Sequence, residues 1–163
     1  LEWSLKKRPQ DVELRETIAG IYETMKRPRL ALAQYQWLIK RKPAPPKAKL
    51  LAYRITRMHL YADLGQESEQ LAALRALRRD YPKNLEVRRE LATYYVDSEK
   101  YDEARAEFKA ILAMSKNDPA TLAAMAKMEK TIADAKRRGS RERREEERYQ
   151  DWLLDLQQRA EDF

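Results

Sequence analysis

The sequence predicts an all-α protein in which antiparallel helix pairs stack one after another. Only three of its 163 residues are glycine, whereas alanine, leucine, arginine, lysine and glutamate, all good helix formers, are abundant. No stretch shows the alternation of apolar and polar residues that a half-buried strand requires. Proline and tyrosine recur with a spacing near 34 residues, as between Pro9 and Pro43 or between Tyr61 and Tyr95. A recurrence of this length is typical of helical repeat arrays.

The first period, residues 11–44, predicts one pair of amphipathic helices. Its first apolar stripe has the spacing of a helix face and consists of Leu14, Ile18, Ile21, Tyr22 and Met25. A second stripe consists of Leu30, Ala31, Tyr35, Leu38 and Ile39. The segment 26–28, Lys-Arg-Pro, separates the stripes and is expected to form the turn.

The second and third periods, residues 50–83 and 84–118, repeat this organisation. Their paired stripes divide at Gly65 and near residues 97–100, respectively. Neither helix of a pair can bury its apolar stripe alone, so neighbouring pairs are expected to stack into a continuous array.

Four further segments flank or interrupt these periods. Residues 1–10 have the spacing of the closing half of a preceding repeat, so the natural protein is expected to extend upstream of Leu1. The insert 43–46, Pro-Ala-Pro-Pro, carries the five-residue excess between the first two periods and cannot be helical. A long polar helix is expected over 119–138. An amphipathic C-terminal helix is expected over 140–163, after a break at Gly139 and Ser140.

The periods carry a known motif. The first contains Arg15-x2-Ile18-Ala19-x2-Tyr22, then Ala31-x3-Tyr35 and Pro43, and the third contains Arg88-x2-Leu91-Ala92-x2-Tyr95 with Ala104-x3-Phe108. This pattern resembles the tetratricopeptide repeat (TPR), W-x2-L-G-x2-Y, A-x3-F and P. All three periods have Arg at the Trp position, and the second has Arg57 and Gln70 where Leu and Ala are usual. The resemblance implies a right-handed TPR superhelix over about residues 1–130, extended by C-terminal helices.

In TPR arrays the first helix of each pair lines a concave groove, where partners bind. The resemblance therefore implies that the groove of this chain is a partner-binding surface. Its candidate contact residues are Glu13, Glu16, Glu23, His59, Asp63, Glu86, Arg89, Glu90 and Asp97.

The charge of this groove is the strongest indication of its ligand. Groove-facing residues sum to −6 in a chain whose net charge is +7, which favours cationic ligands. The alternative is that charged solvated helix faces are common and the sign is chance. The TPR clamp for acidic chaperone tails needs Lys, Asn and Arg, and this chain has other residues there: Glu16, Gly20, Thr56, Glu86 and Glu90.

Catalysis, cofactors and a metal site are not expected. With no cysteine, thiolate nucleophiles and cysteine zinc sites are excluded, and a single histidine excludes two-imidazole sites. His59 has no nucleophile at a convincing spacing, and acid pairs such as Glu13 and Glu16 are more often solvated surface than a glycosidase pair. No apolar run is long enough to span a membrane.

The last part of the chain has two candidate binding features. The basic run 136–148 suggests contacts with phosphate groups. Glutamates are interleaved with its basic residues, however, and it contains no aromatic residue. Nucleic acid is therefore not the favoured partner. An apolar stripe follows, formed by Tyr149, Trp152, Leu153 and Leu156. It either folds back to cap the last repeat or binds a partner or a second copy of the chain, giving a homo-oligomer.

The function expected from the sequence is a non-catalytic TPR scaffold that binds a protein partner through its acidic groove and its C-terminal helix. One alternative is a periplasmic TPR segment of a bacterial exopolysaccharide export machine, which guides a cationic polysaccharide or recruits its modifying enzyme. Another is nucleic-acid binding through residues 136–148. The sequence is compatible with both bacterial periplasm and cytoplasm.

Overall fold

The computed structural model describes the backbone of residues 3, 7–8 and 10–161, and the side chains of residues 3, 7–8 and 10–154. All regular secondary structure in this part of the chain is α-helical, so the all-α prediction is confirmed. The chain divides into two compact units, Leu1–Met114 and Ser115–Phe163. Most of the segment 1–10, expected to close a preceding repeat, lies outside the described residues.

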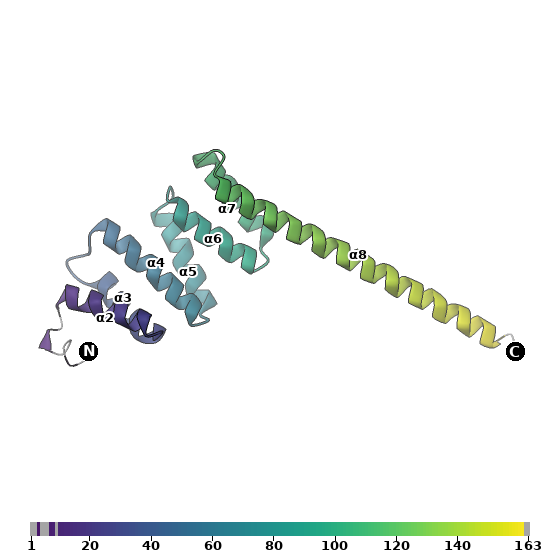
Figure 1. Ribbon diagram of the computed structural model, residues 1–163, viewed down its shortest axis with the longest axis horizontal. Helices are drawn as coiled ribbons and strands as arrows, with labels where there is room; N and C mark the ends of the chain where they lie inside the picture. Colours follow the sequence, from purple (N-terminus) through teal and green to yellow (C-terminus); the bar gives the residue numbers. More distant parts are fainter. Residues whose placement is uncertain (1–2, 4–6, 9, 162–163) are drawn as a thin grey trace. The chain divides into compact units, whose positions relative to one another are not determined.

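The first unit is a series of antiparallel helix pairs (Figure 1). Each helix packs on the next one along the chain, so every pair also contacts its neighbour. The pairs are α2 (Val12–Thr24) with α3 (Pro28–Lys40), α4 (Lys47–Asp63) with α5 (Glu67–Asp80), and α6 (Leu85–Asp97) with α7 (Tyr101–Met114). These bounds place the turns where the apolar stripes divide.

The turns inside the three pairs have the same backbone geometry. Lys26, Gly65 and Glu99 adopt positive φ angles of 51°, 66° and 57°. In each turn the following backbone N–H donates to a carbonyl five residues earlier, at 2.8–2.9 Å, and these carbonyls belong to Tyr22, Tyr61 and Tyr95. This pairing is the Schellman motif, which satisfies helix-terminal carbonyls. The recurring tyrosines therefore mark equivalent places in the three repeats.

The helices α2 and α6, which are the first helices of the first and third pairs, each have a side-chain cap at the N-terminus. Asp11 Oδ1 accepts a hydrogen bond from the Leu14 backbone N–H at 2.9 Å, and Asn84 Oδ1 accepts one from Val87 at 3.0 Å. Such caps satisfy backbone donors that have no partner within the helix. The helix α4 is different, because it begins directly after Pro46 without a side-chain cap.

The core of the first unit follows the apolar stripes. Its fully buried large side chains come from all six helices and include Ile18, Leu38, Met58, Leu74, Leu77, Leu91 and Ile111. Four alanines are also fully buried: Ala19, Ala31, Ala92 and Ala104. Burial of these stripes on both sides of each pair stabilises the stack.

The second repeat has larger residues at two of these alanine positions, and one of them is polar. Met58 stands where the flanking repeats have Ala19 and Ala92, and Gln70 stands at the position of Ala31 and Ala104. The two larger side chains meet, because Gln70 Nε2 lies 4.0 Å from Met58 Sδ. These replacements explain why this repeat departs from the sequence pattern and yet keeps the fold.

The arginine at the Trp position contacts the second helix of its own repeat in all three pairs. Arg15 donates to Gln34 Oε1 at 2.8 Å and lies over the Trp37 ring at 4.0 Å. Arg88 pairs with Glu107 at 2.6 Å, over the same sequence separation. Arg54 pairs with Asp80 at 2.8 Å, near the end of α5, and lies 5.7 Å from the Tyr81 ring. A guanidinium can thus replace the indole as the link between the helices of a pair.

The excess residues between the first two repeats are only partly a loop. Residues 41–46 are non-helical, as their prolines require, but α4 begins at Lys47 and has 17 residues, against 13 in α2 and α6. The extra residues form one additional turn at its start. Lys49, which precedes the predicted start of the second repeat, lies on this turn.

The second unit contains α8 (Pro119–Glu161), a continuous helix of 43 residues. The break expected at Gly139 and Ser140 was therefore wrong. A glycine costs about 1 kcal/mol in a helix relative to alanine, and the surrounding residues are good helix formers. Contacts along the helix support it, such as the Arg141–Glu145 ion pair at 3.0 Å. Without a bend, the end of α8 does not turn back along its own start.

Candidate functional site

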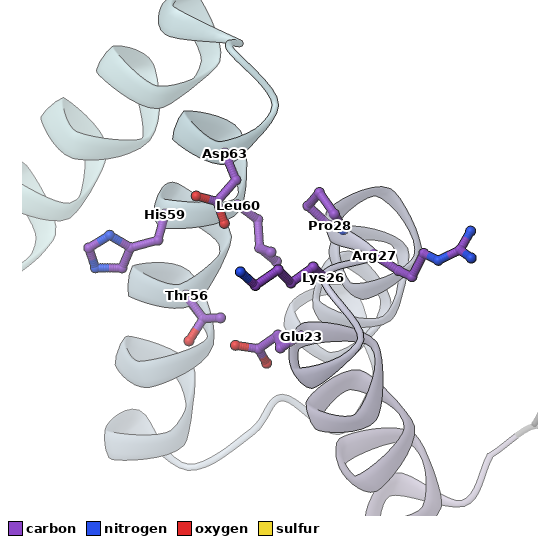
Figure 2. A pocket seen from close by; sticks show the side chains of 8 residues that line it. All are labelled: Glu23, Lys26, Arg27, Pro28, Thr56, His59, Leu60 and Asp63. Carbon is purple, nitrogen blue, oxygen red and sulfur yellow. The ribbon is translucent and has the colours of Figure 1, made fainter.

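The first candidate site is a cavity of about 570 Å³ between α2, α4 and the turn that follows α2. It is lined by Glu23, Lys26, Arg27, Pro28, Thr56, His59, Leu60 and Asp63 (Figure 2). Three predicted groove residues, Glu23, His59 and Asp63, are thus brought together. Figure 2 shows the amine of Lys26 pointing into this space between the two carboxylates, whereas Arg27 points away.

Glu23 has an additional partner in the helix α3. The Tyr35 hydroxyl donates a hydrogen bond to Glu23 Oε1 at 2.5 Å. Burial, followed by this bond to a carboxylate, raises the pKa of Tyr35, so the phenol stays protonated and remains a donor. The bond fixes one acidic side chain of the cavity.

A second cavity of about 360 Å³ lies beside α4, α5 and α6. It is lined by Ala62, Glu67, Gln70, Glu90, Thr93, Tyr94, Asp97 and Ser98. His59 connects the two cavities, because its ring turns away from Glu23 and its Nε2 lies 3.8 Å from Glu90 Oε1. Carboxylates from the first helices of all three pairs line these two cavities, and this set is here called the acidic groove: Glu23, Asp63, Glu90 and Asp97.

Glu16 is held by contacts within the chain. Lys49 Nζ lies 2.8 Å from Glu16 Oε1, and the Tyr53 hydroxyl donates to the same carboxylate. Burial alone would favour the neutral acid, but the hydrogen bonds from Lys49 and Tyr53 outweigh it and lower the pKa of Glu16. Burial and the bond to Glu16 raise the pKa of Tyr53 to about 12. Glu16 therefore links the first two repeats.

The remaining predicted groove residues line neither cavity. Glu13 and Glu86 are exposed near the starts of α2 and α6, and Arg89 is partly buried. Lys26 and Lys49 were absent from the predicted groove and add positive charge beside its acids. The position of Lys26, directly after the first apolar stripe, was the sequence feature that could have placed it beside the groove. No local pattern indicated that its side chain would point into the cavity.

The predicted contact residues of the C-terminal helix are exposed where they are described. Tyr149 is 53% exposed and Trp152 is 54% exposed, and their ring centroids are 5.8 Å apart. Leu153 is partly buried. The side chain of Leu156 lies outside the described residues.

The described residues also bear on metal binding and on membrane insertion. They contain no group of three or more side chains suited to holding a metal ion. None of their helices combines the length and apolar character that crossing a bilayer requires.

The repeat geometry agrees with a family comparison. Residues 62–128 match the family model described as tetratricopeptide repeat. This part of the chain contains tetratricopeptide repeats. Its TPR fold is similar to the crystal structure of TTC0263, a thermophilic TPR protein in Thermus thermophilus. That match has a TM-score of 0.56 and 22% identity, and it covers 80% of this chain and 70% of the other. No curated protein matches the chain.

The TPR fold suggests a general role. TPR domains bind protein partners, and TPR proteins are generally non-catalytic scaffolds. The stacked pairs of this chain suggest a scaffold for protein–protein interaction.

Proposed function

We propose that this TPR scaffold binds a cationic ligand in the acidic groove, and that the ligand is a Lys- or Arg-rich segment of a protein partner. The observation that carries the proposal is the alignment of four carboxylates along two adjoining cavities. Opposite charge attracts such a segment, and the regular spacing of the repeats offers contacts without a large reorganisation of the scaffold.

Lys26 gives the proposal a specific mechanism. Its amine occupies the space between Glu23 and Asp63, where an external lysine or arginine would place its own charge (Figure 2). An incoming cation would displace this side chain, which is exposed and therefore easily moved. Lys26 would thus act as an internal competitor that sets the affinity of the first cavity.

The experiment measures binding of an oligolysine peptide by isothermal titration calorimetry. Replacing the acids of the first cavity (Glu23→Gln with Asp63→Asn) is expected to weaken binding about three- to tenfold, since exposed ion pairs each contribute up to about 1 kcal/mol. Lys26→Gln should strengthen binding. Raising the salt concentration should weaken the binding of every variant that binds.

Matched controls keep the change in net charge but leave the groove intact. Asp102→Asn with Glu103→Gln removes two exposed carboxylates from α7, and Lys109→Gln removes an exposed lysine there. Both controls should leave affinity unchanged. If the α7 control weakened binding as much as the groove variant, attraction by net charge would explain the result and the proposal would be refuted.

A cationic polysaccharide is the alternative ligand for the same groove. A partly de-N-acetylated glycan presents amines along its length, and a periplasmic export machine is the setting in which such a polymer would meet a TPR segment. Chitosan oligosaccharides, compared with their fully acetylated forms, test this alternative. Equal binding of both forms would exclude recognition through the amines.

Two further surfaces on α8 are candidates for partner binding. Nucleic-acid binding through residues 136–148 is a prediction that duplex and single-stranded probes at two salt concentrations would check, with truncation at Arg138 expected to abolish it. The apolar stripe that begins at Tyr149 is a candidate contact for a partner or a second copy.

A further inference from the structure

One face of α8 carries a regular row of exposed residues. They alternate three and four apart, the spacing of a coiled-coil seam, and comprise Ala135, Arg138, Glu142, Glu145, Tyr149 and Trp152. All six are exposed. We call this row the α8 seam.

Charge is distributed unevenly along the same part of the helix. Residues 136–144 include six arginines or lysines and one glutamate, whereas residues 145–151 include four acids and one arginine. A basic half is thus followed directly by an acidic half. Two such helices attract each other over their whole charged length when they run in opposite directions, whereas a level parallel pair would place like charges together.

Aromatic side chains sit at one end of the seam. Tyr149 and Trp152 expose more than half of their surface and pack only loosely on each other, with an interplanar angle of 30°. Large exposed aromatic residues next to each other are characteristic of interaction surfaces. Ala135, a small exposed residue, lies at the other end.

From these features we propose that two copies of the chain pair through antiparallel α8 helices. In the register that places residues 136–142 of one copy against 145–151 of the other, Trp152 packs on Ala135 of the second copy. Arg138 then lies over the ring of Tyr149, as a cation–π contact. This self-association goes beyond the scaffold function and is independent of the acidic groove.

The centre of the seam accounts for a weak pairing. It brings Glu142 of one copy beside Glu145 of the other, and Glu145 already pairs with Arg141 at 3.0 Å. Like charges that face each other repel, so these glutamates lower the stability of the pairing. The pairing is therefore expected to be reversible, with a dissociation constant on the order of 10 μM to 100 μM.

Sedimentation equilibrium of the whole chain measures this association. Trp152→Ala should raise the dissociation constant at least about tenfold, the cost of truncating an aromatic anchor. Leu154→Ala is the matched control, because Leu154 is 57% exposed but lies on the opposite side of the helix from the seam. It should change the constant less than about twofold. Raising salt from about 0.05 M to about 0.5 M should also weaken the pairing.

The direction of pairing needs its own measurement. Since the chain has no cysteine, Ala133→Cys allows a single spin label on the exposed side away from the seam. In the antiparallel register the two labels are offset by about 30 Å along the helix axis, whereas a parallel pair places them level. Electron–electron double resonance distinguishes the two distances.

The outcomes are decisive. The proposal is supported if the chain dimerises, if Trp152→Ala weakens the dimer while Leu154→Ala does not, and if the distance between the two labels is long. A chain that stays monomeric to about 0.5 mM overturns it, because that concentration exceeds the expected dissociation constant. A short label distance overturns the antiparallel arrangement.

Discussion

The ion pairs of Glu107 give the sharpest test of how the third repeat is held together. Glu107 lies on α7 and its side chain is only 7% exposed. Its two carboxylate oxygens contact Arg88 of α6 at 2.6 Å and Arg78 of α5 at 2.8 Å. One buried carboxylate thus connects three helices, and Glu107→Ala removes this connection.

The expected cost follows from the burial of the partners. The Arg88 side chain is 13% exposed, so the substitution leaves a buried guanidinium without its carboxylate, which typically costs about 3–5 kcal/mol. Arg78 is half-exposed and adds at most about 1 kcal/mol. Glu107→Gln should cost less, about 1–2 kcal/mol, because a glutamine can still accept a hydrogen bond from the guanidinium, as Gln34 does from the equivalent Arg15 of the first repeat.

Urea unfolding followed by circular dichroism at neutral pH measures these differences. Glu103→Ala is the control, since Glu103 lies on the same helix and is exposed, and its effect should stay within about 0.5 kcal/mol. If Glu107→Ala and Glu103→Ala destabilised the chain equally, the buried ion pairs would not hold the repeat together and the reasoning would fail.

Three other predictions concern the first two repeats. Gly65→Ala should lower the free energy of unfolding by about 1 kcal/mol, because φ is +66° there; an unchanged thermal midpoint would contradict this. Arg57→Leu should stabilise the chain by about 1–2 kcal/mol, because Arg57 stands at the core position of Ile18 and its Nε is buried without a hydrogen-bond acceptor among the described residues. Differential scanning calorimetry would show this as a raised thermal midpoint, and a lowered one would refute it. The pKa of Glu16 is lower in the folded protein than in the unfolded chain. Its pairing with Lys49 therefore stabilises the fold at pH values above the unfolded-state pKa of Glu16, and this stabilisation is lost as the pH falls through the folded-state pKa. Between pH 7 and pH 3 the wild type should therefore lose more stability in urea than Glu16→Gln does; parallel losses would exclude this linkage.

Local sequence patterns predicted most of the fold because they act over short distances. Apolar residues three and four apart define a helix face wherever it later packs, and Gly65 marks a turn through its own backbone preference. The equivalence of Tyr22, Tyr61 and Tyr95 could also be predicted from the sequence, since the first helix of each pair ends with the same local hydrogen bonds. The continuity of α8 was missed at Gly139, because a single glycine was given more weight than the helix-forming residues on both sides.

The acidic groove could be predicted only in part. The TPR resemblance indicated Glu23, Asp63, Glu90 and Asp97 as groove residues, and in the structure these four residues line the two cavities. Their positive neighbours were not predictable, because a long flexible lysine reaches several ångströms from its backbone and its direction depends on the helices around it.

The sequence by itself determined that this protein is a stack of helix pairs and where each pair turns. These properties depend on residue type and spacing within a few turns of chain. Only the tertiary structure decided which charges remain available to a ligand. In the folded chain Lys49 pairs with Glu16, Arg88 pairs with Glu107, and Lys26 lies between two carboxylates. These residues come from different elements, so the distances between them are fixed only when the helices pack.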